Sequence, residues 1–217
     1  RVSSLEVDRG GVSYTVEKEK GREETEFMRS RDLWFRPIDT RIGPDGQLYV
    51  IDFYNQAILH NDPRGPIHLW NNQAARPDRD HFFGRIHRYT HKEAKSLPKV
   101  DLSTLDGRVA ALGHPNREIR YRAQRLIEEG DVKSAAAKLA DAKGTAKIHA
   151  LWIRAAAGAL TEKEFVAAFA DPSVEIRVTA ARVMEAHPKL ATKNVVAAIA
   201  AAIAKEQDAR GRLHWVA

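Results

Sequence analysis

The chain has 217 residues, which is enough for one large or two modest domains. It contains no cysteine, which excludes disulfides, thiolate metal sites, cysteine nucleophiles and the attachment of a c-type haem within these residues. Its net charge of +6 is spread over both halves without a Lys/Arg block, so we expect no nucleic-acid partner. No apolar run approaches the ~20 residues that span a bilayer, and we expect no membrane-spanning segment here.

The first residues predict strands rather than a targeting signal. The segment RVSSLEVDRGG at the start has no apolar stretch of the kind that a secretory signal carries. Residues 12–16 alternate apolar and polar side chains after two glycines, which predicts a strand, and residues 24–28 predict a weaker one. Because the chain begins at Arg1 and stops in mid-pattern, we expect it to be a segment of a longer protein.

A strand–turn–strand pattern follows. Residues 38–42 and 48–53 predict strands, and Gly43-Pro44-Asp45-Gly46 between them has tight-turn chemistry. Residues 48–53 are nearly continuous in apolar character, which predicts burial on both faces. A third strand is predicted over residues 84–89. This meander is typical of one β-propeller blade, so we expect residues 1–97 to form the C-terminal blade of an incomplete propeller with exposed sheet edges.

The topology of a meander places alternate connections at the same end of the sheet. The loop over residues 30–37 and the long insert over residues 54–83 are therefore expected at one end, and the Gly43–Gly46 turn at the other. Loops of about 30 residues inside compact domains are uncommon and usually functional or disordered. We therefore expect any ligand site of this half among Arg36, Asp52, Tyr54 and His60.

Two alternatives stay open around this end. Arg36 either binds an anionic ligand or ties its loop to a carboxylate such as Asp39 or Asp52. The histidines of the insert and the strand after it either bind a metal with nearby aspartates or make ordinary loop hydrogen bonds. No pair of them has a recognised metal-ligand spacing, so hydrogen bonding is favoured; these histidines are His60, His68, His81, His87 and His91.

Residues 98–217 are rich in Ala, Arg and Glu and contain an internal repeat. Residues 114–129 align with residues 171–186, and the apolar positions fall on one face of a helix. Ile148 lies midway between the matching Ile119 and Ile176, so the unit is about 28–29 residues, a helix pair. Stacked pairs of this kind predict a HEAT-like α-solenoid, which is a common protein-binding fold. The matching Arg120 and Arg177 either bind a partner or, as we favour, hold the repeats together.

Local signals support helices in this half. Thr161 and Glu164 form a predicted capping box, and Asp171-Pro172 predicts a helix with Asp171 as N-cap. Gly130 and Gly144 are expected to follow helix ends. Trp152 is interpreted as a core residue rather than a platform for a ligand.

The chain resembles the propeller-to-HEAT junction of the membrane-bound dehydrogenase-like haem-binding (CxxCH) proteins of planctomycetes and verrucomicrobia. The resemblance covers most of residues 27–217, and its first motif is moderately specific, whereas the helical repeats are generic. The residues that carry it are Phe35-Arg36-Pro37-Ile38-Asp39, residues 43–50, Asp52-Phe53-Tyr54-Asn55, His60, residues 84–88 and His149-Ala150-Leu151-Trp152.

The resemblance implies an exported, periplasmic protein that oxidises a sugar or an alcohol and passes electrons to haem. It implies further propeller blades and a cytochrome domain in the same protein, a haem c on that domain, and a quinone cofactor in the full propeller. Its motifs add Asp39 and Arg85 to the candidate ligand-binding residues. The alternative is a non-catalytic propeller and HEAT scaffold for protein partners. No residue is assigned as the catalytic base, and the isolated segment is expected to be inactive.

Overall fold

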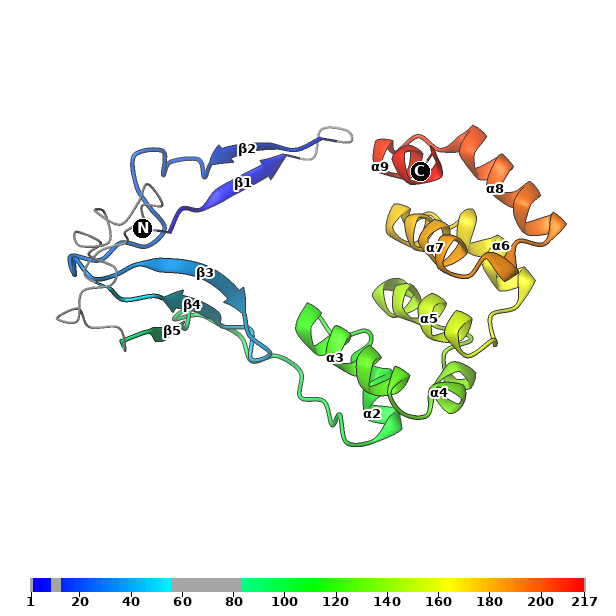
Figure 1. Cartoon of the computed structure of the whole chain (residues 1–217), viewed down its shortest axis with the longest axis horizontal. Helices are drawn as coiled ribbons and strands as arrows, with labels where there is room; N and C mark the ends of the chain where they lie inside the picture. The colour runs from blue at the N-terminus through cyan, green and yellow to red at the C-terminus, as the bar shows by residue number, and fades with distance from the viewer. Residues whose placement is uncertain (1, 9–12, 56–82, 217) are drawn as a thin grey trace, which may run out of the picture. The chain divides into compact units, whose positions relative to one another are not determined.

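The computed structural model describes residues 2–8, 13–55 and 83–216 (Figure 1). Over these ranges the fold is mixed: two small antiparallel sheets come first in the chain, and eight α-helices follow. The chain divides into two compact units, one of residues 1–7 and 16–96 and the other of residues 8–15 and 97–217. We call the first the sheet unit and the second, which contains the described helices, the helical unit.

The first sheet has two strands, β1 (Leu5–Asp8) and β2 (Thr15–Lys18). The strand predicted over residues 12–16 is therefore displaced toward its C-terminal end. The strand predicted over residues 24–28 is wrong, because the chain turns at its start, where the Thr25 amide donates to the Arg22 carbonyl at 3.0 Å. Only Met28 forms an isolated bridge, with Val2, through two backbone hydrogen bonds of 2.9 and 3.1 Å.

The second sheet is an antiparallel meander of β3 (Pro37–Ile42), β4 (Leu48–Asp52) and β5 (Arg85–Tyr89), in that order. The three predicted strands are thus confirmed. The predicted turn is also present: the Gly46 amide donates to the Gly43 carbonyl at 2.9 Å, and the φ of Gly46 is +76°. Glycine adopts this left-handed conformation without steric cost.

A carboxylate fixes this turn to the sheet. Asp45 accepts hydrogen bonds from the Gln47 amide at 3.1 Å, the Tyr49 hydroxyl at 2.9 Å and the Arg88 Nε at 2.8 Å. The turn residue is therefore bound to its own strand, β4, and to the far strand, β5. The turn end of the meander is held by polar contacts.

The sheet unit buries little apolar surface. Val50 is fully buried and Phe35 is 8% exposed, whereas Ile38, Ile42 and Ile86 are all more than half exposed. The prediction that the strand over residues 48–53 is buried on both faces is wrong. Val50 and Asp52 are buried but lie on one face, and Tyr49 and Ile51 on the other face are only partly buried. Phe53, at the end, is 47% exposed. Over the described ranges the strands form two small open sheets and no closed barrel or propeller.

The helical unit consists of helices that follow one another in a row (Figure 1). Chain neighbours pack as pairs, and α3, α5, α7 and α9 also contact one another in series. A 3₁₀ turn, η2 (Pro188–Leu190), precedes α8. The helices are α2 (Leu105–Ala111), α3 (Arg117–Glu128), α4 (Val132–Lys138), α5 (Gly144–Ala156), α6 (Glu162–Phe169), α7 (Val174–Ala186), α8 (Lys193–Lys205) and α9 (Ala209–Val216).

Two apolar clusters form the core of the helical unit. One joins α2, α3, α4 and α5, and Ile119 packs against it. The other joins α5, α6, α7 and α8; Ile176 belongs to it, and Ile148 and Trp152 pack against it. The predicted apolar face of the repeat is therefore confirmed, and Trp152 contributes to the core. Because both clusters take residues from α5, burial is continuous along the row of helices.

The repeated arginines hold the loop that leads into their own helix. In each arginine one guanidinium nitrogen, Nη1, donates to two backbone carbonyls. The bonds at equivalent positions of the two repeats have nearly equal lengths. Arg120 bonds His114 at 2.7 Å and Pro115 at 2.9 Å; Arg177 bonds Asp171 at 2.8 Å and Pro172 at 3.0 Å. A partial third copy exists, in which Arg212 donates to the Gln207 carbonyl at 3.3 Å. The interpretation that these arginines serve packing is thereby supported.

The helix ends confirm some predicted signals and correct others. The capping box of Thr161 and Glu164 is present at the start of α6. The predicted start at Pro172 is wrong, because α7 begins at Val174 with Ser173 as N-cap. The Asp171 carboxylate accepts from the Ser173 amide at 3.0 Å, and this local turn replaces a helical one. Gly144 does not follow a helix end but begins α5, with a φ of +54°.

Candidate functional site

The candidate site lies at the end of the meander opposite the Gly43–Gly46 turn. Pro37, Asp52 and Arg85 pair across the three strands at this end. The chain before β3 returns here beside the chain after β4: the Phe53 amide donates to the Arg36 carbonyl at 2.9 Å, and the Asn55 amide to the Trp34 carbonyl at 3.1 Å. The predicted meeting of both connections at one end of the sheet is confirmed for the residues that the structure describes.

Asp52 is the centre of the site. Its side chain is fully buried at the end of the central strand, on the same face as Val50 two residues earlier. One carboxylate oxygen, Oδ1, accepts from the Arg36 amide at 2.7 Å and from the Tyr54 amide at 3.0 Å. The other, Oδ2, contacts the Arg85 guanidinium at 3.1 Å and the His87 Nε2 at 3.0 Å. We call this set the Asp52 cluster.

The Asp52 cluster keeps its carboxylate ionised. Burial by itself raises the pKa of Asp52, but the hydrogen bonds from His87, the Arg36 amide, Arg85 and the Tyr54 amide outweigh burial, so that the pKa lies below its ordinary value. With four donors on two oxygens, the carboxylate is committed to the strands and loops around it. This arrangement suits a fixed structural anion better than a group that accepts a proton from a substrate.

Tyr54 is held in an unusual backbone conformation. Its φ is +44°, in the left-handed region that non-glycine residues seldom adopt. The Asp52 carboxylate holds the Tyr54 amide in place, which offsets the cost of this conformation. Strained residues of this kind cluster at functional sites, because the surroundings fix a side chain where an ordinary turn would not place it.

An aromatic rim surrounds the Tyr54 ring. The Arg85 guanidinium lies over this ring, 3.3 Å from its centroid, and the Trp34 ring centroid is 5.5 Å away. Asp32 lies 3.5 Å from Arg85, and a hydrogen bond to Asp32 together with burial raises the pKa of the Tyr54 hydroxyl. Phe83 adds a third ring, 6.3 Å from Trp34. We call Asp32, Trp34, Tyr54, Phe83 and Arg85 the aromatic rim.

The predicted site residues divide into three groups. Asp52, Tyr54 and Arg85 come together directly. Arg36 joins them through its backbone amide, while its guanidinium donates to the Leu33 carbonyl and, at 3.1 Å, to the Phe35 carbonyl. This loop contact favours the structural alternative for the Arg36 side chain.

Asp39 and His60 do not belong to the described cluster. The Asp39 carboxylate lies 3.1 Å from Arg41 and accepts from the Thr40 amide at 2.8 Å. A register shift in β3 between Pro37 and Asp39 separates this carboxylate from the ladder at Asp52. His60 lies outside the residues that the structure describes, as do His68 and His81, and the prediction for His60 stays a prediction.

Sequence reasoning missed three residues of the site, which are Asp32, Trp34 and Phe83, and gave His87 only as a metal ligand or a residue that makes ordinary hydrogen bonds. His87 follows Arg85 by two positions on β5, and this alternation was a usable signal, because both side chains then face Asp52 on the neighbouring strand. Asp32 accepts from the Trp34 amide at 2.9 Å, a local turn that aspartate commonly forms. The pairing of that turn with β5 depends on tertiary structure.

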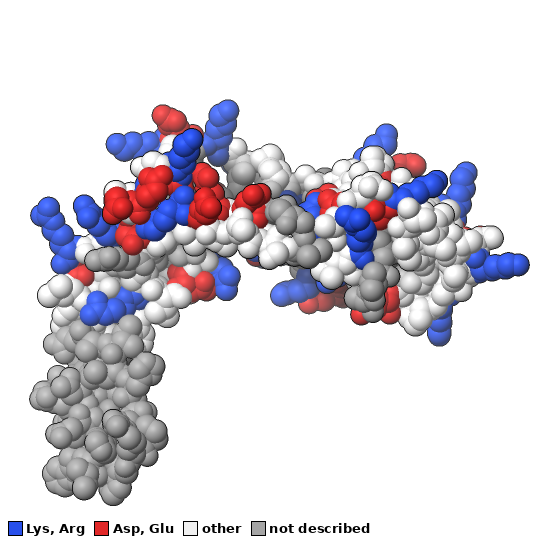
Figure 2. Space-filling model, turned by 90° about the horizontal axis from the view of Figure 1, so that it is seen from above, with Lys and Arg blue, Asp and Glu red and all other residues white. Residues whose placement is uncertain are grey.

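A metal site, a basic patch and a membrane span are three further features through which a chain of this kind could act. Within residues 2–8, 13–55 and 83–216, no group of three acidic or histidine side chains is placed to hold a metal ion. On the face seen in Figure 2, basic and acidic side chains are interspersed over the described residues of each unit. No helix in the described part of the chain is long and apolar enough to cross a bilayer.

Comparison with known families gives one match. The model of a family described as a domain of unknown function (DUF7133) matches residues 2–93. The match includes the whole meander, the Asp52 cluster and the aromatic rim, and it ends before the first helix. No curated protein matches the chain, and no solved structure does.

Proposed function

We propose that this chain is the junction between a β-propeller blade and a HEAT-like α-solenoid in an exported dehydrogenase-like protein, and that its sheet unit supplies one rigid wall of a ligand pocket. The Asp52 cluster carries this proposal. A single buried carboxylate fixes the leading loop, the turn after β4 and two side chains of β5. A ligand-binding surface needs side chains and loops that several contacts hold in place, as they are here.

The aromatic rim is the part of this wall that a ligand meets. Arg85 offers hydrogen-bond donors beside the rings of Tyr54 and Trp34, and Asp32 offers acceptors. Rings next to a few fixed polar groups suit a small polar cyclic molecule, which stacks on the rings and bonds at its edge. The substrate class of the proposal, a sugar or an alcohol, comes from the family resemblance.

The HEAT-like part of the proposal is supported by contacts that recur between successive helix pairs. The Lys147 ammonium lies 2.6 Å from the Asp171 carboxylate, and the Arg177 guanidinium lies 2.7 Å from the Glu206 carboxylate. In each case a basic side chain on one helix of the series α3, α5, α7 and α9 pairs with an acidic side chain in the loop that leads into the next helix of that series. Repeated links between neighbours are characteristic of solenoids, in which each repeat contacts the repeats beside it.

The resemblance implies two cofactors, haem c and a quinone, and each can be compared with the residues of this chain. Covalent attachment of haem c requires cysteine thiols, and these 217 residues contain none. A haem c does not fit this chain, and its attachment site belongs to another part of the proposed protein. Nothing about the described residues is specific to a quinone. We therefore assign this chain a role in binding and positioning the ligand, and no chemical step.

The test uses a longer protein that contains this chain and measures sugar- or alcohol-dependent reduction of a dye. We expect Arg85→Ala, Arg36→Ala and His60→Ala to lower turnover while the circular dichroism stays unchanged. Lys99→Ala, in the helical unit before α2, is the control. Unchanged turnover in all three variants would contradict the ligand wall.

A second candidate function is a non-catalytic scaffold that binds protein partners. The continuous row of helix pairs favours it, because stacked pairs present an extended surface. The same assay separates the two functions. A purified longer protein that reduces no dye with any of a panel of sugars and alcohols, with haem and quinone supplied, would favour the scaffold and exclude the dehydrogenase.

A further inference from the structure

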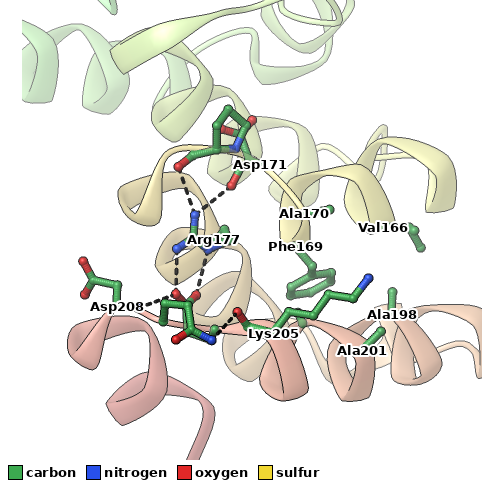
Figure 3. A pocket seen from close by; sticks show the side chains of 13 residues that line it. Val166, Phe169, Ala170, Asp171, Arg177, Ala198, Ala201, Lys205 and Asp208 are labelled. Atoms are coloured by element: carbon green, nitrogen blue, oxygen red, sulfur yellow. Dashed lines mark hydrogen bonds and ion pairs between the residues drawn. The ribbon is translucent and has the colours of Figure 1, made fainter.

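The helical unit contains a groove that plays no part in either proposed function. It has a volume of about 840 Å³ and lies between α6 and α8, with α7 at its base (Figure 3). We call it the α6–α8 groove. Its size falls within the range of small-molecule sites, about 300–1,000 Å³. Its lining is largely apolar; the apolar members are Val166, Phe169, Ala170, Pro172, Ala198, Ala201 and Ala202.

The groove is apolar because two helices turn matching faces toward it. Val166, Phe169 and Ala170 follow one another at helical spacing on α6, and Ala198, Ala201 and Ala202 do so on α8. Phe169 is 1% exposed and forms the floor. The alanine side chains of α8 are short, so the space above that helix is left for a ligand chain.

The charges at one end of the groove are paired. Asp171 is bound to Lys147, Glu206 to Arg177 and Asp208 to Arg210, at 2.6, 2.7 and 3.1 Å. The hydrogen bond from Arg210 lowers the pKa of Asp208 to about 2. All three carboxylates therefore already have cationic partners, and the charges at this end of the groove largely cancel.

The remaining cation of the lining is Lys205. Among the described residues it makes no ion pair, and its side chain is exposed. Figure 3 shows the side chain running back along α8 toward Ala198, past the Phe169 ring and away from the paired carboxylates. Long basic side chains commonly cover apolar surface with their stem while the charged end stays in water.

From this arrangement we infer that the α6–α8 groove binds an unbranched apolar carboxylate of medium chain length. The carboxylate pairs with the Lys205 ammonium, and the chain lies on Phe169 and the α8 alanines. The Lys205 ammonium sets the direction, because the other charged side chains of the described lining are already paired. Ala198 and Lys205 are seven residues apart, about 10 Å along the helix, which matches a chain such as decanoate.

The test titrates the 217-residue chain with decanoate, below its micelle concentration, by isothermal calorimetry. We expect saturable binding at one site per chain. Lys205→Gln should raise the Kd for decanoate about fivefold, the factor of an exposed ion pair, and leave the Kd for decanol unchanged. Lys193→Gln, at the other end of α8, is the matched control and should change neither Kd.

A second variant tests the groove itself. Ala201→Leu places a larger side chain on the exposed wall and should weaken decanoate and decanol alike, while the helical circular dichroism stays unchanged. Three results would overturn the inference: no saturable decanoate binding, equal effects of Lys205→Gln and Lys193→Gln, or full affinity in Ala201→Leu. Binding of an acidic amphipathic peptide in place of decanoate would also overturn it. Each result is independent of dye reduction.

Discussion

The sheet unit and the helical unit are stabilised in opposite ways. Among the described residues, the sheet unit buries two apolar side chains, Phe35 and Val50, and sets a fully buried carboxylate beside them. The helical unit has two apolar clusters that share α5 and extend along the row of helices. In the sheet unit the ion-pair contacts to a buried group converge on the Asp52 carboxylate, whereas in the helical unit such contacts recur from one helix pair to the next.

This contrast shows how a small unit is made specific without a large core. Apolar burial is non-directional, so the few buried side chains of a small sheet do not by themselves fix one arrangement of its strands and loops. The four hydrogen bonds of Asp52 are directional, and together they reach three segments: the loop before β3, the turn after β4 and the strand β5. The sheet unit should therefore depend on one residue, whereas the helical unit should tolerate the loss of any one contact.

The largest expected effect is that of Asp52→Ala. It removes four hydrogen bonds at once and leaves Arg85 and His87 without their buried partner. Breaking a buried pair costs about 3–5 kcal/mol, so we expect the sheet unit to unfold while the helical unit remains. Amide hydrogen exchange of β4, compared with circular dichroism at the helical wavelength, measures the two units separately.

Asp39→Ala is the matched control, because it removes the same group from the same sheet at an exposed ion pair with Arg41. It should change the free energy of unfolding by less than about 0.5 kcal/mol. If Asp52→Ala behaved like this control, or if it melted the helices to the same extent, the contrast between the units would be wrong.

The next effect is a pH dependence that differs between the units. Burial and the nearby charge of Arg120 lower the pKa of His149 to about 4, from about 6.5 in an unfolded chain. Between these values the unfolded chain binds a proton that the folded chain does not. The free energy of unfolding of the helical unit should therefore fall as the pH drops from 6.5 to 4, by up to about 3 kcal/mol.

The sheet unit should respond at lower pH. The pKa of Asp52 lies below its ordinary value, so the stability that this group contributes is present above about pH 4 and is lost below it. Chemical unfolding at pH 7, 5, 4 and 3 measures both units. His149→Gln should flatten the slope of the helical unit; an unchanged slope in this variant would show that another group titrates.

The sequence was informative wherever the signal was local. The β-rich segments around Gly43–Gly46 predicted three strands, and the helical periodicity predicted the buried face of Ile176. Part of the candidate site was also predictable from the sequence. A meander brings alternate connections to the same end of the sheet, and this topology predicted that Asp52 and Tyr54 lie in the site.

The sequence was uninformative wherever the chain length varied or tertiary contacts decided the structure. The third copy of the arginine contact was missed because Arg212 follows Arg177 by 35 residues rather than 28–29, since α8 is longer than α6. The contacts of Asp32 with Arg85 and of Trp34 with Phe83 join segments about 50 residues apart, and no local sequence pattern predicts them. The start of α7 was misplaced because the Asp171 turn competes with the helix.

The smallest expected effect is that of Thr161→Ala at the start of α6. The Glu164 amide donates to the Thr161 hydroxyl at 3.3 Å, and the Thr161 amide donates to the Glu164 carboxylate at 2.9 Å. The variant loses the first bond and the bond of 2.7 Å that the Thr161 hydroxyl donates to the Glu164 carboxylate, at a cost of about 1 kcal/mol to the helical unit. Ser173→Ala removes an N-cap hydroxyl that makes no cap hydrogen bond and should cost less than about 0.5 kcal/mol. Urea unfolding followed by circular dichroism distinguishes them. Because Arg154 still pairs with Glu164 at 2.8 Å in the first variant, the unit should remain folded, as a core spread over many contacts requires.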